Sequence, residues 1–147
     1  MREYVKLGGH WSIGTDSHIG INPLEEFKMI DYRQRLVSNF RNTFEGDAAR
    51  YMVNEEIESG RMAMGNKFTN HFAIDQPFDA IVYNAQSHLL ADTSEKNRLA
   101  TIVFTGDSSR NLGTIVNGKW VVKNQHHING RKLKDDFAKA MKELKNR

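Results

Sequence analysis

The sequence has 147 residues, which suffices for one ordinary domain or two small units. Hydrophobic residues make up 39% and charged residues 27%, so the composition fits a folded protein with a packed core and excludes a disordered chain. The absence of cysteine excludes disulfides and thiolate metal sites, and no apolar run approaches the roughly 20 residues of a membrane span or resembles a secretory leader. We therefore expect a cytoplasmic protein with no membrane partner.

The net charge of +3 is concentrated at the end of the sequence. From residue 131 on, seven Lys and Arg stand against three Asp and Glu. A basic face on a terminal helix is usually a solvated face, and no basic patch interleaved with aromatic residues accompanies it. We therefore expect no nucleic-acid partner.

The first half of the sequence predicts three helices and one short strand. Gly8-Gly9 can end the first helix, because glycine readily adopts the left-handed conformation typical of helix C-caps. Asn22-Pro23 supplies an N-cap and a first helical residue for the second helix. Glycines at 60 and 65 bracket a loosely patterned connector after the third helix. The predicted segments are a helix end at 1–7, a strand at 10–15, and helices at 23–40 and 44–59.

The second half predicts a small β unit followed by a closing helix. Asn117-Gly118 between two apolar runs is the strongest short signal for a hairpin. Thr93 or Ser94 can cap a short turn of helix that reaches Leu99, and His126-His127 predicts a surface turn. The other predicted segments are strands at 78–83, 101–104, 112–116 and 119–122, and a helix from 130 onward.

The residues most able to perform chemistry follow the first predicted strand, in Thr15-Asp16-Ser17-His18. A carboxylate at a strand end can bind a divalent cation or accept a proton from metal-bound water, although Asp16 can equally cap a turn. His18 can be a metal ligand, a substrate contact, an orienting residue or an ordinary hydrogen-bonding residue. The two residues do not complete a zinc site, which usually takes three or four protein ligands, and the other histidines lack ligand spacing. The sequence has no nucleophile elbow and no glycine-rich phosphate loop.

Two stretches of the sequence resemble the amidohydrolase superfamily, whose members are metal-dependent hydrolases built on a TIM barrel. The first stretch contains Ile-Gly-Thr-Asp-Ser-His, then Asn-Pro-Leu-Glu-Glu-Phe, then Asp-Tyr-Arg-Gln-Arg-Leu, and is most similar to formiminoglutamate deiminases. The second stretch is similar to the β-sandwich segment that closes that family's chain. The resemblance spans most of the sequence and is weakest over 60–76. The matching segments are 13–18, 22–27 and 31–36 in the first stretch, and 102–109 and 115–122 in the second.

The resemblance implies an α/β fold that represents the C-terminal part of a TIM-barrel amidohydrolase, with the last barrel strand and its helices. It divides the chain into the end of the barrel at 1–60, part of a small β-sandwich at 61–128, and a helix returning to the barrel at 129–147. The histidines and catalytic glutamate of the family's earlier strands have no counterpart in this sequence. We therefore expect a fragment that is inactive alone and that forms a dimer through exposed apolar surface.

The resemblance also implies a chemistry. Asp16 would be the aspartate of the eighth barrel strand, both a metal ligand and a catalytic proton shuttle, and Ser17 and His18 would lie at the substrate pocket. The cofactor would be a divalent metal, with zinc expected, bound only weakly by the fragment. The substrate would be a small molecule, N-formimino-L-glutamate in histidine degradation, whose C–N bond is hydrolysed with release of ammonia. Two alternatives remain open: a self-sufficient, non-enzymatic α+β module derived from this family, or a deaminase of another subfamily acting on ring amines.

Overall fold

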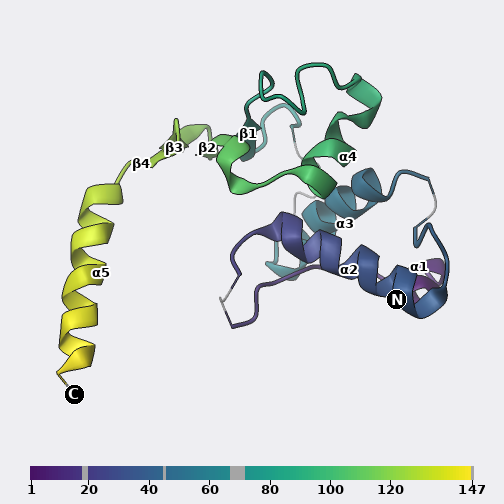
Figure 1. The fold of residues 1–147 in the computed structure, drawn as a ribbon, viewed down its shortest axis with the longest axis horizontal. Helices are drawn as coiled ribbons and strands as arrows, with labels where there is room; N and C mark the ends of the chain where they lie inside the picture. Colours follow the sequence, from purple (N-terminus) through teal and green to yellow (C-terminus); the bar gives the residue numbers. More distant parts are fainter. Residues whose placement is uncertain (18–19, 45, 67–71, 147) are drawn as a thin grey trace. The chain divides into compact units, whose positions relative to one another are not determined.

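The chain divides into two compact units, which the computed structural model in Figure 1 shows in sequence colours. The structure describes residues 1–17, 20–44, 46–66 and 72–146. The first unit consists of Met1–Gln76 and Asn84–Arg110, and the second consists of Pro77–Tyr83 and Asn111–Arg147. Helices α1 to α4 lie in the first unit, whereas the four-stranded sheet and α5 lie in the second. The predicted mixture of helices and strands is confirmed, and the predicted division of the chain at residues 60 and 128 stays a prediction.

The first unit holds the hydrophobic core. Its helix α4 contacts both α2 and α3, so the three helices enclose side chains from each of them. Removing these side chains from water is the main favourable contribution to the stability of this unit. The helices are α1 (Arg2–Lys6), α2 (Pro23–Ser38), α3 (Ala48–Ala63) and α4 (Glu95–Thr105), followed by a 3₁₀ turn at Ser108–Arg110. The buried hydrophobic residues are Leu24, Phe27, Phe44, Ala49, Met52, Leu90 and Val103.

Local capping signals predict the helix ends of the first unit well. The Asn22 side chain accepts a hydrogen bond from the Leu24 amide at 3.1 Å, and α2 ends before Asn39, which is left-handed with φ 55°. The predicted helix at 23–40 is thus confirmed to within two residues. The predicted helix at 44–59 instead begins at Ala48, after the Asp47 cap, and continues to Ala63. The expected connector after Gly60 is wrong because the left-handed C-terminal glycine is Gly65, with φ 75°.

Two strands predicted for the first unit do not form. Residues 101–104 belong to α4, which extends the predicted short helix to Thr105. The β-branched side chains there favour a strand locally, but Val103 is fully buried in the helical core, and burial overrides that preference. Residues 10–15 are not assigned to a strand either, and no described strand pairs with them. The helix end predicted at 1–7 is confirmed by α1 and by Gly8, whose φ is 76°.

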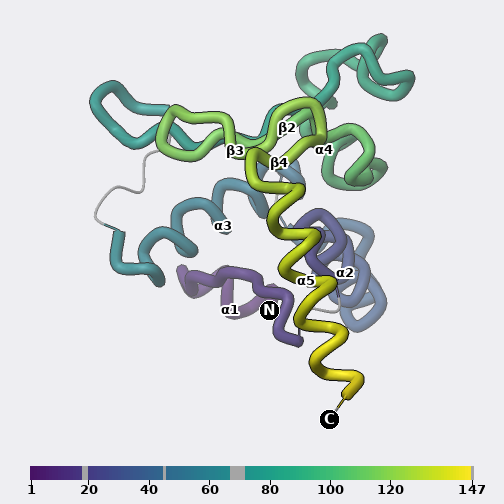
Figure 2. Tube along the Cα trace, turned by 90° about the vertical axis from the view of Figure 1, so that its left-hand side faces the viewer, coloured from purple at the N-terminus to yellow at the C-terminus, as the bar shows by residue number. Residues whose placement is uncertain are grey.

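The second unit contains an antiparallel sheet with the strand order β1-β2-β3-β4, in which Figure 2 labels β2, β3 and β4. The hairpin between β2 and β3 turns at Asn117-Gly118, where both residues have positive φ, as a type I′ turn requires. The strands predicted at 78–83, 112–116 and 119–122 are therefore confirmed, with small changes of bounds. The strands are β1 (Ala80–Tyr83), β2 (Asn111–Val116), β3 (Lys119–Lys123) and β4 (His126–His127).

The surface turn predicted at His126-His127 is wrong. The chain reverses one step earlier, at Asn124 and Gln125, which both have positive φ. His127 therefore lies opposite Val122, and the two histidines form the short edge strand β4. A turn is present in this region, but it is formed by the two residues before the histidines.

Helix α5 (Gly130–Lys145) confirms the predicted closing helix. Its large apolar residues form one exposed stripe, with Phe137 68% accessible and Leu144 57%. The stripe consists of Leu133, Phe137, Met141 and Leu144. The buried hydrophobic residues of the described chain all lie in the first unit. Among the described residues, no helix combines the length and apolar character needed to cross a membrane.

Candidate functional site

The predicted metal ligand Asp16 lies in an exposed turn after an extended segment. Its φ of 49° is left-handed, a conformation that aspartate adopts more readily than most residues. Ser17 follows in the same turn and is also exposed, whereas His18 lies outside the described residues. The part of the chain that the structure describes contains no group of three or more His, Cys, Asp and Glu side chains able to hold a metal ion. The fold therefore presents Asp16 without assembling further ligands around it from the described residues.

Two carboxylates of α3 hold the extended segment that leads to Asp16. The Trp11 amide donates to Glu55 Oε1 at 3.1 Å, and the Ile13 amide donates to Glu56 Oε2 at 2.7 Å. In an extended chain, successive amides point to opposite sides, so those of residues two apart point the same way. The carboxylates thus accept hydrogen bonds where an adjacent strand would supply carbonyl oxygens.

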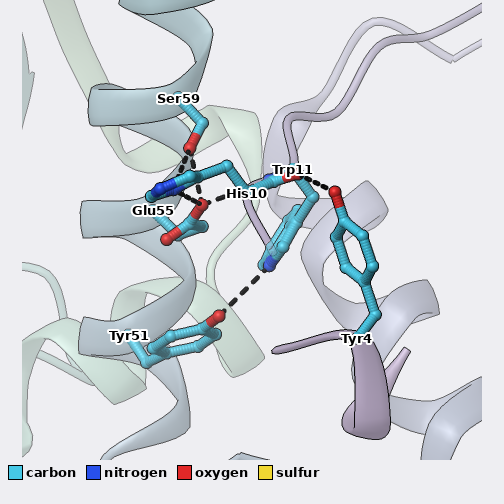
Figure 3. A network of polar contacts seen from close by, with 6 residues as sticks. All are labelled: Tyr4, His10, Trp11, Tyr51, Glu55 and Ser59. Carbon is cyan, nitrogen blue, oxygen red and sulfur yellow. Dashed lines mark hydrogen bonds and ion pairs between the residues drawn. The ribbon is translucent and has the colours of Figure 1, made fainter. Parts of the chain in front are cut away.

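Glu55 is the centre of a polar network on α3, which Figure 3 shows. His10 Nδ1 lies 3.1 Å from Glu55 Oε1, and the Ser59 hydroxyl donates to the same oxygen at 2.5 Å. Ser59 Oγ is also 3.4 Å from His10 Nδ1. A hydrolytic triad requires the histidine to lie between serine and acid, with a different ring nitrogen for each. Here both partners approach Nδ1 and the serine donates to the acid, so the network ties the segment to α3 instead of activating a nucleophile.

The environments of the two neighbouring glutamates shift their pKa values in opposite directions. Burial by itself would raise the pKa of Glu55, but hydrogen bonds from Ser59, the Trp11 amide and His10 together bring that pKa below its ordinary value. Burial raises the pKa of Glu56, and its hydrogen bond from Ile13 offsets only part of this effect. The fold therefore favours the ionised form of Glu55 and disfavours the ionised form of Glu56.

An aromatic cluster fixes the start of the same segment. The Trp11 indole nitrogen donates to the Tyr51 hydroxyl at 3.3 Å (Figure 3). The Phe44 ring centroid lies 4.8 Å from that of Tyr51 and 6.2 Å from that of Trp11. The Tyr4 hydroxyl donates to the His10 carbonyl at 2.9 Å, which ties α1 to the segment. Burial raises the pKa of Tyr51, so its hydroxyl stays protonated at neutral pH.

The sequence analysis singled out Asp16, whose role stays a prediction, but missed the residues that hold its segment in place. Glu55 and Ser59 are four positions apart, which places them on one face of a helix, and this spacing is the only local signal of their contact. Their bonds to His10 and Trp11 join positions more than 40 residues apart, and no periodicity or motif predicts such pairing.

Comparison with known proteins connects the chain to amidohydrolases. No family model matches it. Over 146 residues it is 25% identical to formimidoylglutamate deiminase of Pseudomonas aeruginosa. This alignment covers 97% of the chain and 32% of the deiminase. The crystal structure of an amidohydrolase from Brucella melitensis matches with a TM-score of 0.78 at 25% identity, over 97% of this chain and 32% of the other. The chain therefore spans about a third of the length of these relatives. The predicted resemblance is confirmed: the chain is a distant homologue of formimidoylglutamate deiminase, and its mixed α/β fold matches part of an amidohydrolase.

Proposed function

We propose that this chain corresponds to the C-terminal portion of a metal-dependent deaminase of the amidohydrolase type, which hydrolyses a C–N bond and releases ammonia. The observation that carries the proposal is an alignment with formimidoylglutamate deiminase that runs through 97% of the chain. The finer fold that we propose is the last barrel strand with its helices, part of the β-sandwich, and the closing helix. The proposed substrate is N-formimino-L-glutamate, with ring amines as the alternative substrate class.

In this proposal Asp16 is the metal ligand and proton shuttle, and Ser17 and His18 contact the substrate. The exposed carboxylate of Asp16 is free to meet a cation, but one carboxylate does not make a zinc site. We infer that the other ligands come from polypeptide corresponding to the remaining two thirds of the relatives. A divalent metal would supply Lewis acidity and lower the pKa of water. Asp16 would then hold the proton of the attacking water and pass it to the departing nitrogen.

The activity is best tested in a chimera, because the chain alone is expected to be inactive. This chain replaces the aligned third of the Pseudomonas aeruginosa deiminase, and ammonia release from N-formimino-L-glutamate is measured with added zinc. We expect turnover that falls by at least about a hundredfold in Asp16→Asn, since general acid–base catalysis contributes this much. A folded, zinc-loaded chimera whose rate is unchanged by Asp16→Asn would contradict the role of Asp16. Turnover by the isolated chain would contradict its status as an inactive portion.

A second candidate is a self-sufficient, non-enzymatic module. It is favoured by the first unit, which has its own buried core and satisfies the amides of residues 11 and 13 internally. This candidate predicts a monodisperse protein that unfolds cooperatively and whose melting temperature does not respond to zinc. An inactive chimera together with these properties would favour the module over the deaminase.

A further inference from the structure

We propose that Glu55 and Glu56 form a carboxylate clamp that takes the place of a neighbouring β-strand and fixes how the extended segment presents Asp16. Both glutamates are positioning residues, since they hold the backbone of residues 11 and 13 and do not reach Asp16 through any bond that the structure shows. The clamp goes beyond the proposed function, because it would hold the segment whether or not Asp16 binds a metal.

The first argument concerns the backbone donors of the segment. Amides that are partly removed from water need partners, and no described strand pairs with residues 10–15. Trp11 and Ile13 lie about 7 Å apart along an extended chain, and adjacent side chains on α3 diverge by about 100° around the helix. The carboxylates of Glu55 and Glu56 nevertheless accept from two successive donors on one side of the segment, the amides of residues 11 and 13. Hydrogen bonds to a carboxylate are stronger than those between neutral groups, which makes two such bonds an effective substitute for a strand.

The second argument is that neighbouring residues on the same face of α3 fix one half of the clamp, the Glu55 carboxylate. Tyr51, Glu55 and Ser59 follow one another at intervals of four residues, so they occupy one face of α3 over three successive turns. Ser59 is buried and its hydroxyl bonds to Glu55, which fixes the carboxylate in place. Tyr51 receives the indole hydrogen bond of Trp11 one turn earlier, which sets the register of the segment on the helix (Figure 3).

The third argument links the clamp to Asp16. Ile13, the last residue whose backbone is held by Glu56, lies three residues before Asp16. Three residues reach at most about 11 Å even when fully extended, so a fixed Ile13 confines the Asp16 turn to a small region beside α3. Side-chain exposure alternates along the segment in the way of a strand: Trp11, Ile13 and Thr15 are half-buried, whereas residues 12, 14 and 16 are exposed.

Amide hydrogen exchange of the 147-residue chain tests the clamp without any assay of activity. We expect Glu56→Ala to lower the protection of the Ile13 amide by about tenfold or more, since hydrogen bonds to charged groups contribute this much. Glu56→Gln should retain most of the protection, because its amide oxygen still accepts a hydrogen bond. Glu58→Ala is the matched control: Glu58 is exposed on the same helix, and its removal should leave the protection of Ile13 unchanged. The Asp16 amide should become more mobile in Glu56→Ala only, as seen in its heteronuclear relaxation.

A second measurement keeps the clamp testable if the alanine variant does not fold. In the unsubstituted chain, the proton shift of the Ile13 amide should follow the titration of Glu56, and that of Trp11 should follow the titration of Glu55. Each inflection should vanish in the corresponding Gln variant. Unprotected Trp11 and Ile13 amides in the unsubstituted chain, or equal protection in the Glu56→Ala and Glu58→Ala variants, would overturn the clamp. Either result would leave the role of Asp16 in the chimera undecided, so the two proposals fail independently.

Discussion

At the scale of single residues, two adjacent glutamates perform the same task at different electrostatic cost. Glu55 accepts bonds from a hydroxyl, an amide and an imidazole, whereas Glu56 accepts one amide bond from Ile13. Because the pKa of Glu55 is lowered in the folded state, its contribution to stability is present above the ordinary glutamate pKa and is lost as pH falls through the folded value. The pKa of Glu56 is raised, so its effect on stability has the opposite pH dependence. Its contribution to the free energy of unfolding is present at low pH and is lost as pH rises through the folded value.

These signs predict different effects for two isosteric substitutions. Glu55→Gln should lower the free energy of unfolding by about 1 kcal/mol at neutral pH, and the deficit should shrink as the pH falls below 4.5, the ordinary value for this carboxyl. Glu56→Gln should be neutral or stabilising at neutral pH, because it removes a partly desolvated charge while keeping an acceptor for Ile13. Urea unfolding as a function of pH measures both, and a common pH trend in the two variants would refute the assignment.

An ion pair on α2 between a buried carboxylate and a partly exposed arginine gives a second prediction at this scale. Asp31 is fully buried, and its Oδ2 lies 2.6 Å from Arg35 Nη2, while its Oδ1 has no hydrogen-bond partner among the described residues. Arg35→Met should destabilise the chain by about 2 kcal/mol, less than for a fully buried pair because the Arg35 side chain is 37% exposed. Adding Asp31→Asn should recover most of the loss, since the uncompensated charge is removed. Denaturant melts of the single and double variants check this, and additive losses would argue against the pairing.

At the scale of elements, helix caps and tight turns could be predicted from the sequence because they depend on neighbouring residues, whereas strand pairing could not. The start of α2 and the β2–β3 turn depend on Asn22-Pro23 and Asn117-Gly118, which act within a few residues, and both were found. Residues 101–104 and 10–15 have the local character of strands, yet a strand exists only where another strand pairs with it. The same limit applies to the candidate site: a motif suggested Asp16, whose role stays a prediction, whereas the contacts of Glu55 and Glu56 depend on a fold that no local pattern encodes.

Two glycines in different elements should respond oppositely to alanine. Gly60 lies inside α3, where an added methyl group would meet the Glu56 carboxylate at 3.4 Å, an ordinary contact distance. Gly60→Ala should therefore stabilise the chain by up to about 1 kcal/mol through helix propensity. Gly118 has φ 73° in the hairpin turn with open space around it, so Gly118→Ala should destabilise by about 1 kcal/mol through backbone strain alone. Thermal melts of both variants, compared with the unsubstituted chain, test the assignment of each conformation.

At the scale of the whole molecule, large apolar side chains are exposed in both units. On α2, the core face carries Leu24 and Phe27, while Met29 and Leu36 on another face are 64% and 80% exposed. A helix that is apolar on more than one face is typical of an element buried in a larger structure. In the second unit, α5 exposes a comparable stripe. These surfaces are why we propose that the isolated chain forms dimers.

Self-association should depend on the α5 stripe more than on its polar face. Phe137→Gln removes the most exposed large hydrophobic side chain of this helix, and we expect it to shift sedimentation toward the monomer. Ala138→Gln adds the same group one position along the helix, outside the stripe, and should leave the distribution unchanged. A chain that sediments as a monomer at all concentrations would refute the dimer.

A segment of the first unit, Asn84–Arg110, is inserted between two strands of the second unit, and this insertion affects the expected order of folding. β1 is separated from its partner β2 by Asn84–Arg110, a segment that belongs to the first unit and contributes α4 to its core. The β2–β3 hairpin closes across a two-residue turn, so it can form within microseconds, whereas β1 must wait for a long loop to be shortened. Packing of α4 against α2 and α3 performs that shortening. We therefore expect the first unit to fold before β1 pairs with β2.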